Sequence, residues 1–318
     1  MKITTLIPAY KTKYIVELLT ALRVQTRPSS RIVISDDSPG GEFSALLESA
    51  PLRGLRQGLP IEVHQGPRNG AYENFKHLAG LWGSDSELVH LLLDDDVLYP
   101  EFYERHLIAH ASGRYSCSIS GRWTANEGGQ PIGGQPLPKA VAGAGERILS
   151  LNDDVVFMTT VPWCRNWFGE FSNCVMSADS VALLAKPEFG GVSYAGLWDL
   201  GFFLAASIQA PIAYIQDRLG CFRTGGENNS SQFFGKFMKA AHLGYAALAL
   251  GGERIGKLSR EQALLCYRGI APAMLQRYGS QEDMLPFCAL LARMAEGDAE
   301  AETEFERVWA QYLRGHGF

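Results

Sequence analysis

The segment Leu88-Val89-His90-Leu91-Leu92-Leu93-Asp94-Asp95-Asp96 joins a short apolar run to three consecutive acids. A bounded apolar run of this length is typical of a buried strand. Carboxylates at the end of such a strand lose hydration and repel one another, and a bound divalent cation offsets both costs. Oxygen ligands suit Mg²⁺ or Mn²⁺. The segment therefore predicts a cation site where a strand ends, although a solvated acidic turn explains the same residues.

Strand and helix patterns alternate around this segment. Strands are predicted at residues 2–8, 31–35, 60–64 and 87–93, and helices at residues 15–22 and 69–81. This alternation predicts a parallel or mixed sheet with helices on both faces. Ligands of such sheets bind beyond the carboxyl ends of the strands. Because Asp36 and Asp37 also follow a predicted strand, we expect them to lie at the same edge as the three consecutive acids.

The second half of the chain becomes mainly helical. Residues 124–145 are predicted to form a long surface loop, 171–184 a strand and then a helix, 197–210 a helix, and 212–215 a short strand. After about Ser231, helical patterns cover residues 237–250, 260–278, 284–295 and 301–313. The sequence therefore predicts an α/β domain over residues 1–230 and a helical region over residues 231–318.

Composition narrows the functional classes. A net charge of -5 disfavours nucleic-acid binding, which relies on many Lys and Arg contacts to phosphate. The six cysteines contain no Cys-x-x-Cys pair, which favours buried, reduced thiols and a cytoplasmic protein. No segment approaches the roughly 18 apolar residues of a membrane span. We expect no transmembrane segment, and the sequence leaves peripheral membrane contact and homo-oligomer formation open.

The order of the N-terminal motifs resembles the family 2 glycosyltransferases, which are inverting enzymes of the GT-A fold. The matching segments are Thr5–Tyr10, Ile34–Ser38, Arg68–Gly70 with Asn74, Leu93–Pro100, Gly190-Gly191 and Leu197–Leu200. The resemblance covers residues 3–230 and leaves out the helical tail. It implies a GT-A-type, Rossmann-like mixed sheet flanked by helices, a nucleotide-sugar donor, and Mn²⁺ or Mg²⁺ as cofactor.

The resemblance also implies which residues bind the donor nucleotide and sugar. They are Pro8, Ala9, Tyr10, Asp36, Asp37, Arg68, Asn69, Asp94, Asp95, Trp198 and Arg223. A carboxylate such as Asp37 can accept a hydrogen bond from a base imide N–H or a ribose hydroxyl, and Arg68 can neutralise phosphate. Simpler interpretations exist, with Asp36 and Asp37 in an Asx-turn or helix N-cap and Asn69 as an N-cap.

Asp94 and Asp96 fit the family's Asp-x-Asp pattern, and both are predicted metal ligands. Leu93 stands where relatives often carry a further acid, so Asp95-Asp96 is an equally good alignment. Asp96 is our first choice as the metal ligand. A neighbouring acid would then hold sugar hydroxyls or ribose.

Asp199 is the predicted catalytic residue. An inverting transfer needs a carboxylate that takes the proton of the acceptor hydroxyl, and an ordinary aspartate is ionised at neutral pH. Trp198 beside it could form an apolar wall for a sugar. The alternative is an acid that stabilises a helix N-terminus.

Arg223 precedes a stretch rich in Gly, Asn and Ser, where relatives carry a mobile loop. We predict a flexible lid with Arg223 near the phosphates, and a plain surface loop is the alternative.

These patterns predict a metal-dependent inverting glycosyltransferase. It would move a sugar from UDP or dTDP to a hydroxyl of a glycan, a lipid-linked glycan or a protein. A nucleotidyltransferase is one alternative, but such enzymes carry a Gly-rich basic phosphate loop, and Tyr10-Lys11-Thr12-Lys13 has no glycine. The other alternative is a non-catalytic sugar-nucleotide-binding protein.

Overall fold

The computed structural model describes residues 1–225 and 231–318. It forms two compact units. The first comprises Met1–Leu151, Phe168–Lys186 and Gln209–Thr224, and the second comprises Asn152–Trp167, Pro187–Ile208 and Gly225–Phe318. The division into residues 1–230 and 231–318 stays a prediction. The lid predicted from the Gly-, Asn- and Ser-rich stretch falls on residues 226–230, outside the described residues.

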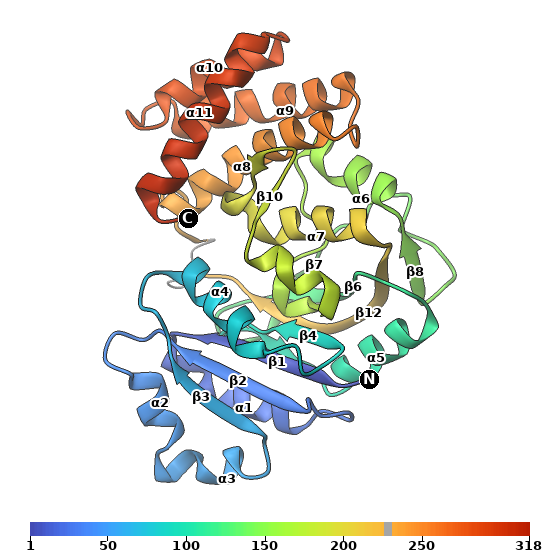
Figure 1. Cartoon of the computed structure of the whole chain (residues 1–318), viewed down its shortest axis with the longest axis vertical. Coiled ribbons are helices and arrows are strands. Elements are labelled where there is room, and N and C mark those ends of the chain that lie inside the picture. The colour runs from blue at the N-terminus through green and yellow to red at the C-terminus, as the bar shows by residue number, and fades with distance from the viewer. Residues whose placement is uncertain (226–230) are drawn as a thin grey trace. The chain divides into compact units, whose positions relative to one another are not determined.

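Within the described residues, the first unit contains one ten-stranded mixed sheet (Figure 1). Its order is β3-β2-β1-β4-β9-β6-β12-β5, with β7 paired to β6 and β8 paired to β12. The strands are β1 (Ile3–Ala9), β2 (Arg31–Asp36), β3 (Ile61–Gln65), β4 (Leu88–Leu91), β5 (Val97–Leu98), β6 (Cys117–Ala125), β7 (Pro131–Gly134), β8 (Ile148–Leu151), β9 (Cys174–Ser177) and β12 (Ile212–Arg223). Because β3, β2, β1 and β4 are parallel, their carboxyl ends share one edge.

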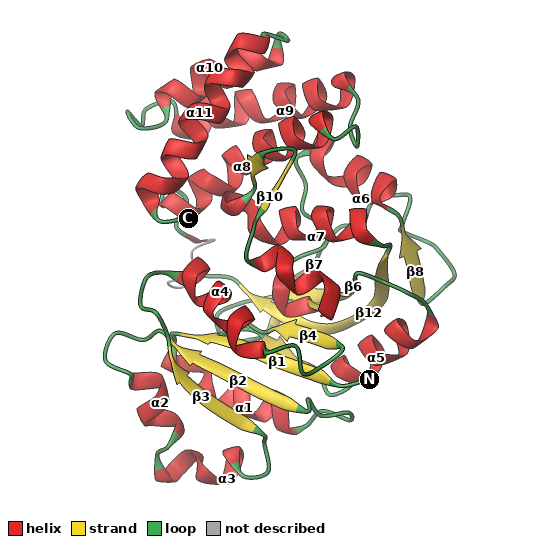
Figure 2. Ribbon diagram, viewed as in Figure 1, coloured by secondary structure: helices red, strands yellow, loops and turns green. Residues whose placement is uncertain are grey.

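Helices cover both faces of this sheet, as Figure 2 shows for α1 (Ile15–Arg23) and α4 (Ala71–Trp82). Side chains alternate across a strand. Ile3 and Ile7 of β1 therefore pack with the buried face of α1, while Leu6 points to the opposite face. The remaining helices of this unit are α2 (Glu42–Leu47), α3 (Arg53–Arg56) and α5 (Phe102–Ser112). The predicted α/β architecture, a mixed sheet flanked by helices, is confirmed.

The second unit is mainly helical (Figure 2). It contains α6 (Asp153–Thr160), α7 (Trp198–Gln209, whose last residue falls in the first unit), α8 (Lys236–Arg254), α9 (Arg260–Tyr278), α10 (Leu285–Ala295), α11 (Ala299–His316), and the short strands β10 (Glu188–Phe189) and β11 (Val192–Ser193). Local signals fix the helix starts, since Ser259 and Gln262 form a capping box on α9 and Asp298 caps α11. No helix among the described residues is long and apolar enough to cross a membrane.

Several predicted elements differ from the structure. The strand predicted at residues 212–215 is the first third of β12, which has 12 residues. Register shifts between Ile215 and Arg218, and between Arg218 and Cys221, break the alternation that reveals a strand in sequence. The loop predicted at 124–145 contains β7, and residues 178–184 form a 3₁₀ helix. The strand predicted to reach residue 93 ends at Leu91.

Candidate functional site

The three consecutive acids form a turn between β4 and β5. The backbone N–H of Asp96 donates to the carbonyl of Leu93 at 3.3 Å, and β5 then pairs with β12. All three are buried, with exposed fractions of 5% for Asp94, 9% for Asp95 and 4% for Asp96. The solvated acidic turn is therefore excluded for this segment.

Asp94 fastens the acidic turn to the end of β1. Its Oδ2 atom accepts hydrogen bonds from the backbone N–H groups of Tyr10 and Lys11, both at 2.6 Å. Burial, and then the charge of Asp95, raise the pKa of Asp94 to about 7. Metal ligation by Asp94 stays a prediction, and its other oxygen would have to serve.

Asp95 is held from two sides. Its carboxylate forms an ion pair with the ammonium of Lys11. Its backbone carbonyl accepts a hydrogen bond from Nε of Arg223 at 2.8 Å. Lys11 was not among the predicted site residues, although it directly follows Tyr10.

Asp96 has the oxygen best suited to a cation. Its Oδ1 atom accepts from the backbone N–H of Arg223 at 3.4 Å, whereas Oδ2 is buried without a hydrogen-bond partner in the described part of the chain. Burial, and then the charge of Asp95, raise the pKa of Asp96 to about 7. The side chain of Ser172, the charge of Arg122 and the backbone of Arg223 act in the opposite direction and lower this pKa. A buried carboxylate oxygen without a hydrogen bond is costly, so the environment of Oδ2 fits a bound cation.

A protein-only cation cage is not found among the described residues, because no three His, Cys, Asp or Glu side chains group in a suitable way. This arrangement suits Mg²⁺ or Mn²⁺ held by one or two carboxylates together with substrate phosphates. A small cavity of about 10 Å³ adjoins Asp96 and is also lined by Arg122, Glu170 and Ser172. Arg122 and Glu170 form an ion pair at 2.6 Å. Neither was predicted, because each lies far in sequence from the acids.

Arg223 is the last residue of β12 and precedes the stretch for which a flexible lid is predicted. Only 3% of Arg223 is exposed. Besides its contact with Asp95, its Nη1 atom donates to the carbonyl of Glu127 at 3.0 Å, and its guanidinium lies 4.5 Å from the ring centre of Tyr14. The lid and the plain surface loop both concern the stretch after Arg223 and stay untested, and the contact of Arg223 with phosphate stays a prediction.

Asp36 stabilises the turn after β2. Its two oxygens accept from the backbone N–H and the hydroxyl of Ser38, at 3.0 and 2.5 Å, and from those of Ser44, at 2.9 and 2.5 Å. Burial acts to raise the pKa of Asp36, but these hydrogen bonds outweigh it and the pKa is lowered. The Asx-turn interpretation fits Asp36.

Asp37 is placed differently from Asp36. Its N–H donates to the carbonyl of Ala9 at 2.8 Å, and its Oδ1 atom accepts from the backbone N–H of Arg68 at 2.5 Å. The structure thereby brings the ends of β1 and β2 and the segment after β3 together. The Arg68 side chain is exposed, and its backbone has a φ of 55°. A donor contact through Asp37 and Arg68 stays a prediction.

Gly70, not Asn69, is the N-cap of α4, and its φ of 96° favours glycine. The simpler interpretation of Asn69 is therefore wrong, and Asn69 is exposed beside this helix start.

Pro8 and Ala9 belong to β1, so the strand predicted at residues 2–8 extends one residue further. The carbonyl of Leu6 accepts a hydrogen bond from the N–H of Leu92, so the backbone polar groups of Leu6 face β4. Pro8 lies two residues further along β1, and its nitrogen therefore faces the same side. The pairing of β1 with β4 has already ended at Leu6. The missing N–H of proline is therefore harmless there. Tyr10, which is 57% exposed, begins the turn over the acids.

Trp198 and Asp199 belong to the second unit, at the start of α7. Asp199 is half-buried, and Trp198 is only 3% exposed, which leaves little of its ring for a sugar. The neighbouring Tyr245 phenol has a raised pKa, chiefly through burial, with a smaller contribution from the charge of Asp199. The helix-start interpretation and the base interpretation both fit this position.

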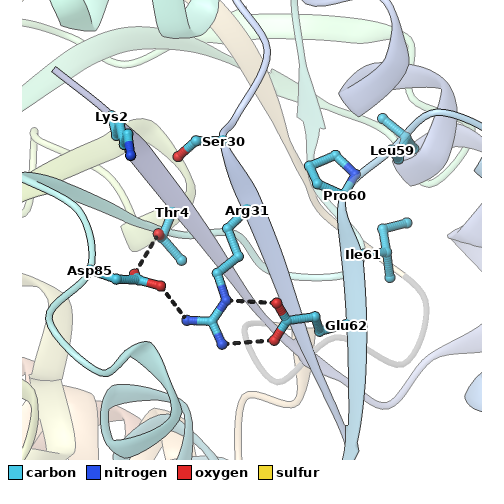
Figure 3. A pocket seen from close by; sticks show the side chains of 9 residues that line it. All are labelled: Lys2, Thr4, Ser30, Arg31, Leu59, Pro60, Ile61, Glu62 and Asp85. Atoms are coloured by element: carbon cyan, nitrogen blue, oxygen red, sulfur yellow. Dashed lines mark hydrogen bonds and ion pairs between the residues drawn. The ribbon is translucent and has the colours of Figure 1, made fainter.

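A cavity of about 420 Å³ lies at the amino ends of β1, β2 and β3 (Figure 3). Arg31 crosses it and forms ion pairs with Glu62 at 2.7 Å and Asp85 at 3.0 Å. The charge of Arg31 is thus paired with two acids of the cavity wall. Because ligands of such sheets bind at the carboxyl ends of the strands, this cavity is not the candidate site.

Comparisons with known proteins agree with this geometry. Residues 4–161 match the family described as Glycosyl transferase family 2. The crystal structure of S. aureus TarS with UDP-GlcNAc is similar over 98% of this chain and 92% of that chain, with a TM-score of 0.54 and 16% identity. The mannosyltransferase PcManGT from Pyrobaculum calidifontis, in complex with GDP-Man and Mn²⁺, is similar over 98% of this chain and 80% of that chain, with a TM-score of 0.54 and 14% identity.

No curated protein matches the sequence significantly. The likeness to the solved structures establishes the fold, which is that of the GT-A glycosyltransferases. The family match and this fold together define the chain as a glycosyltransferase. The chain belongs to glycosyltransferase family 2.

Proposed function

We propose that this protein is a metal-dependent inverting glycosyltransferase that uses a UDP- or dTDP-sugar. The observation that carries the metal dependence is Asp96, whose buried Oδ2 atom lacks a hydrogen-bond partner among the described residues. Its place after β4, at the edge where ligands of parallel sheets bind, supports the same proposal.

The proposed reaction is one in-line displacement. Asp199 takes the proton of the acceptor hydroxyl while that oxygen forms a bond to the anomeric carbon. The bond from this carbon to the donor diphosphate breaks on the opposite face, and the configuration inverts. A cation held by Asp96, with Asp94 or Asp95 nearby, would supply positive charge for the departing diphosphate.

The donor and acceptor classes are supported to different degrees. The similar structures carry UDP-GlcNAc and GDP-Man, which supports a nucleotide-sugar donor for this chain. We keep UDP or dTDP as the nucleotide because a carboxylate such as Asp37 suits the imide N–H of uracil or thymine. A glycan, a lipid-linked glycan or a protein remains our acceptor class. The six cysteines, none in a disulfide among the described residues, support a cytoplasmic location.

A thermal-shift panel of UDP-, dTDP- and GDP-sugars with Mn²⁺ tests the donor. A ligand at a hundred times its dissociation constant stabilises a protein by roughly 2.7 kcal/mol, which gives a readable rise in melting temperature. We expect a rise with UDP- or dTDP-sugars that disappears in EDTA. A rise only with GDP-sugars would contradict the nucleotide, and full sugar transfer in EDTA would contradict metal dependence.

A further inference from the structure

Lys11 is a cation poised over the acidic turn. Its ammonium forms an ion pair with Asp95, and its backbone N–H donates to Asp94 at 2.6 Å. Asp94 thereby fixes the Lys11 backbone, while 32% of the Lys11 side chain is exposed. The backbone of Lys11 is held in place, and its side chain reaches Asp95 from a partly exposed position.

Two further cations lie near this turn and are held far more firmly: Arg122 pairs with Glu170 at 2.6 Å, and Arg223 is tied to the backbone. Arg223 is 3% exposed and donates to the carbonyls of Asp95 and Glu127. These contacts tie Arg223 to the backbone, so it has little freedom to change partner. Lysine differs from arginine in carrying a compact charge on a flexible four-carbon stem. Lys11 is therefore the cation at this turn best able to exchange partners.

A divalent cation at Asp96 would sit one residue from the carboxylate that Lys11 occupies. Two cations repel each other at short range in a buried site, where screening is weak. The ammonium would then be displaced from Asp95 toward solvent. An anionic diphosphate that binds with the metal offers it a new partner, and lysine binds phosphate well as a point charge.

We propose that Lys11 exchanges partners during donor binding. Its ammonium neutralises Asp95 while no divalent cation is bound, and it contacts the donor diphosphate once the cation has displaced it. This inference rests on the proposed function, which it extends with a residue that positions the donor. It predicts opposite effects of Lys11 on metal binding and on nucleotide binding.

The test compares Lys11→Met with the wild-type protein in two binding experiments. Mn²⁺ alone, measured by the signal of the free ion in electron paramagnetic resonance, should bind about three- to tenfold more tightly once the competing ammonium is gone. UDP in the presence of saturating Mn²⁺ should bind about tenfold more weakly, because a charged hydrogen bond to phosphate is lost. Lys11→Arg should restore much of the UDP affinity.

Lys13→Met is the matched control. Lys13 lies two residues away, is 61% exposed in its side chain, and pairs with Glu127. This substitution removes the same charge from the same segment but leaves the ion pair with Asp95 intact. The affinities for Mn²⁺ and for UDP should therefore both stay within about twofold. Lys11→Gln provides a polar replacement if Lys11→Met does not fold.

The outcomes separate this inference from the proposed function. If both affinities fall together in the folded Lys11 variants, Lys11 has only a structural role and the exchange is wrong. Unchanged affinities would also overturn it. Wild-type protein that binds Mn²⁺ but none of the nucleotides would contradict the proposed function, and with it the phosphate half of the exchange.

Discussion

The three acids of the turn differ in what their carboxylates contact. Asp94 accepts two backbone N–H groups and Asp95 pairs with Lys11, whereas Oδ2 of Asp96 has no hydrogen-bond partner in the described chain. A charge buried in this way destabilises the metal-free protein. Asp96→Asn should therefore raise the melting temperature of the metal-free protein at pH 8, and it should abolish the additional rise that Mn²⁺ gives to the wild type.

The difference in melting temperature between the wild type and Asp96→Asn should depend on pH, and the raised pKa of Asp96 fixes the direction of that dependence. The pKa of Asp96 is raised from 3.8 to about 7 in the folded state. The folded wild type therefore takes up a proton as pH falls through 7, and it gains stability relative to the variant down to about pH 4. The buried His90, whose pKa is lowered to about 3, lowers the stability of the folded protein as pH falls over the same range, because only the unfolded chain takes up its proton. This effect is the same in the wild type and the variant. The difference in melting temperature should shrink between pH 8 and 5, and a constant difference would contradict the prediction.

Asp199 carries the chemical prediction. Asn has nearly the same shape but cannot take a proton at neutral pH, so Asp199→Asn should reduce sugar transfer by roughly 10²–10⁴-fold. Donor affinity should stay within a few-fold, because the base contacts the acceptor. Near-normal transfer would assign the base to another carboxylate, and retention of the anomeric configuration in the product would rule out a single displacement.

The residues that the sequence identified and those it missed differ in a physical way. The acids and Asp37 follow strands, so their position in a motif already indicates an edge of the sheet. Arg122 and Glu170 meet only through tertiary packing, and an interaction over 48 positions leaves no local signal. Arg223 was identified by its motif, but its burial in β12 depends on pairing with β6, which local patterns do not show.

Among the elements, the long helices were the most predictable. The pattern at 260–278 matches the bounds of α9. In contrast, β6 was missed because Ser118 and Ser120 stand at buried positions that usually hold apolar residues. The hydroxyl of Ser118 forms a hydrogen bond at 2.7 Å with the ring of His106 on α5. The sequence alone does not show that these two residues meet.

The end of β3 offers a test of how the strand ends position Asp37. A Cβ atom on Gly66 would lie 2.6 Å from Oδ1 of Asp37 and 3.0 Å from the carbonyl of Asp36. Gly66→Ala should therefore displace Asp37, lower the melting temperature, and weaken UDP binding. Gly133→Ala in β7, where a Cβ atom meets nothing within 4 Å, is the control and should leave UDP affinity unchanged. Normal UDP affinity in Gly66→Ala would argue against Asp37 as a donor ligand.

At the scale of the whole chain, a sequence indicates its elements more directly than the way in which they group. The second unit draws on Asn152–Trp167 and Pro187–Ile208 as well as on the helical tail. Hydrophobic periodicity shows that a helix has a buried face, but it does not show what covers that face. A role of the tail in acceptor binding or self-association stays a prediction.

Contacts within the second unit show what the tail supports. The 3₁₀ helix η6 (Ala195–Leu197) ends two residues before Asp199. A Cβ atom on Gly196 would lie 2.4 Å from the ring of Trp309 in α11 and 2.7 Å from the carbonyl of Ala240 in α8. A chain that ends near residue 232 loses these partners and exposes apolar surface. We expect it to be poorly soluble, or to bind nucleotide if it folds.

Gly196→Val tests the same contact without removing a helix. The larger side chain must push α8 or α11 away, so we expect a lower melting temperature and slower sugar transfer through a disturbed Asp199. UDP affinity should stay within a few-fold, because the predicted nucleotide ligands Asp37 and Arg68 belong to the first unit. Gly315→Ala in α11, with nothing within 4 Å of its Cβ atom, is the control and should be neutral or slightly stabilising. If Gly196→Val loses UDP binding as completely as transfer while it stays folded, then the second unit, which holds the predicted donor residue Trp198, also takes part in nucleotide binding, and the expectation that UDP affinity depends on Asp37 and Arg68 alone is wrong.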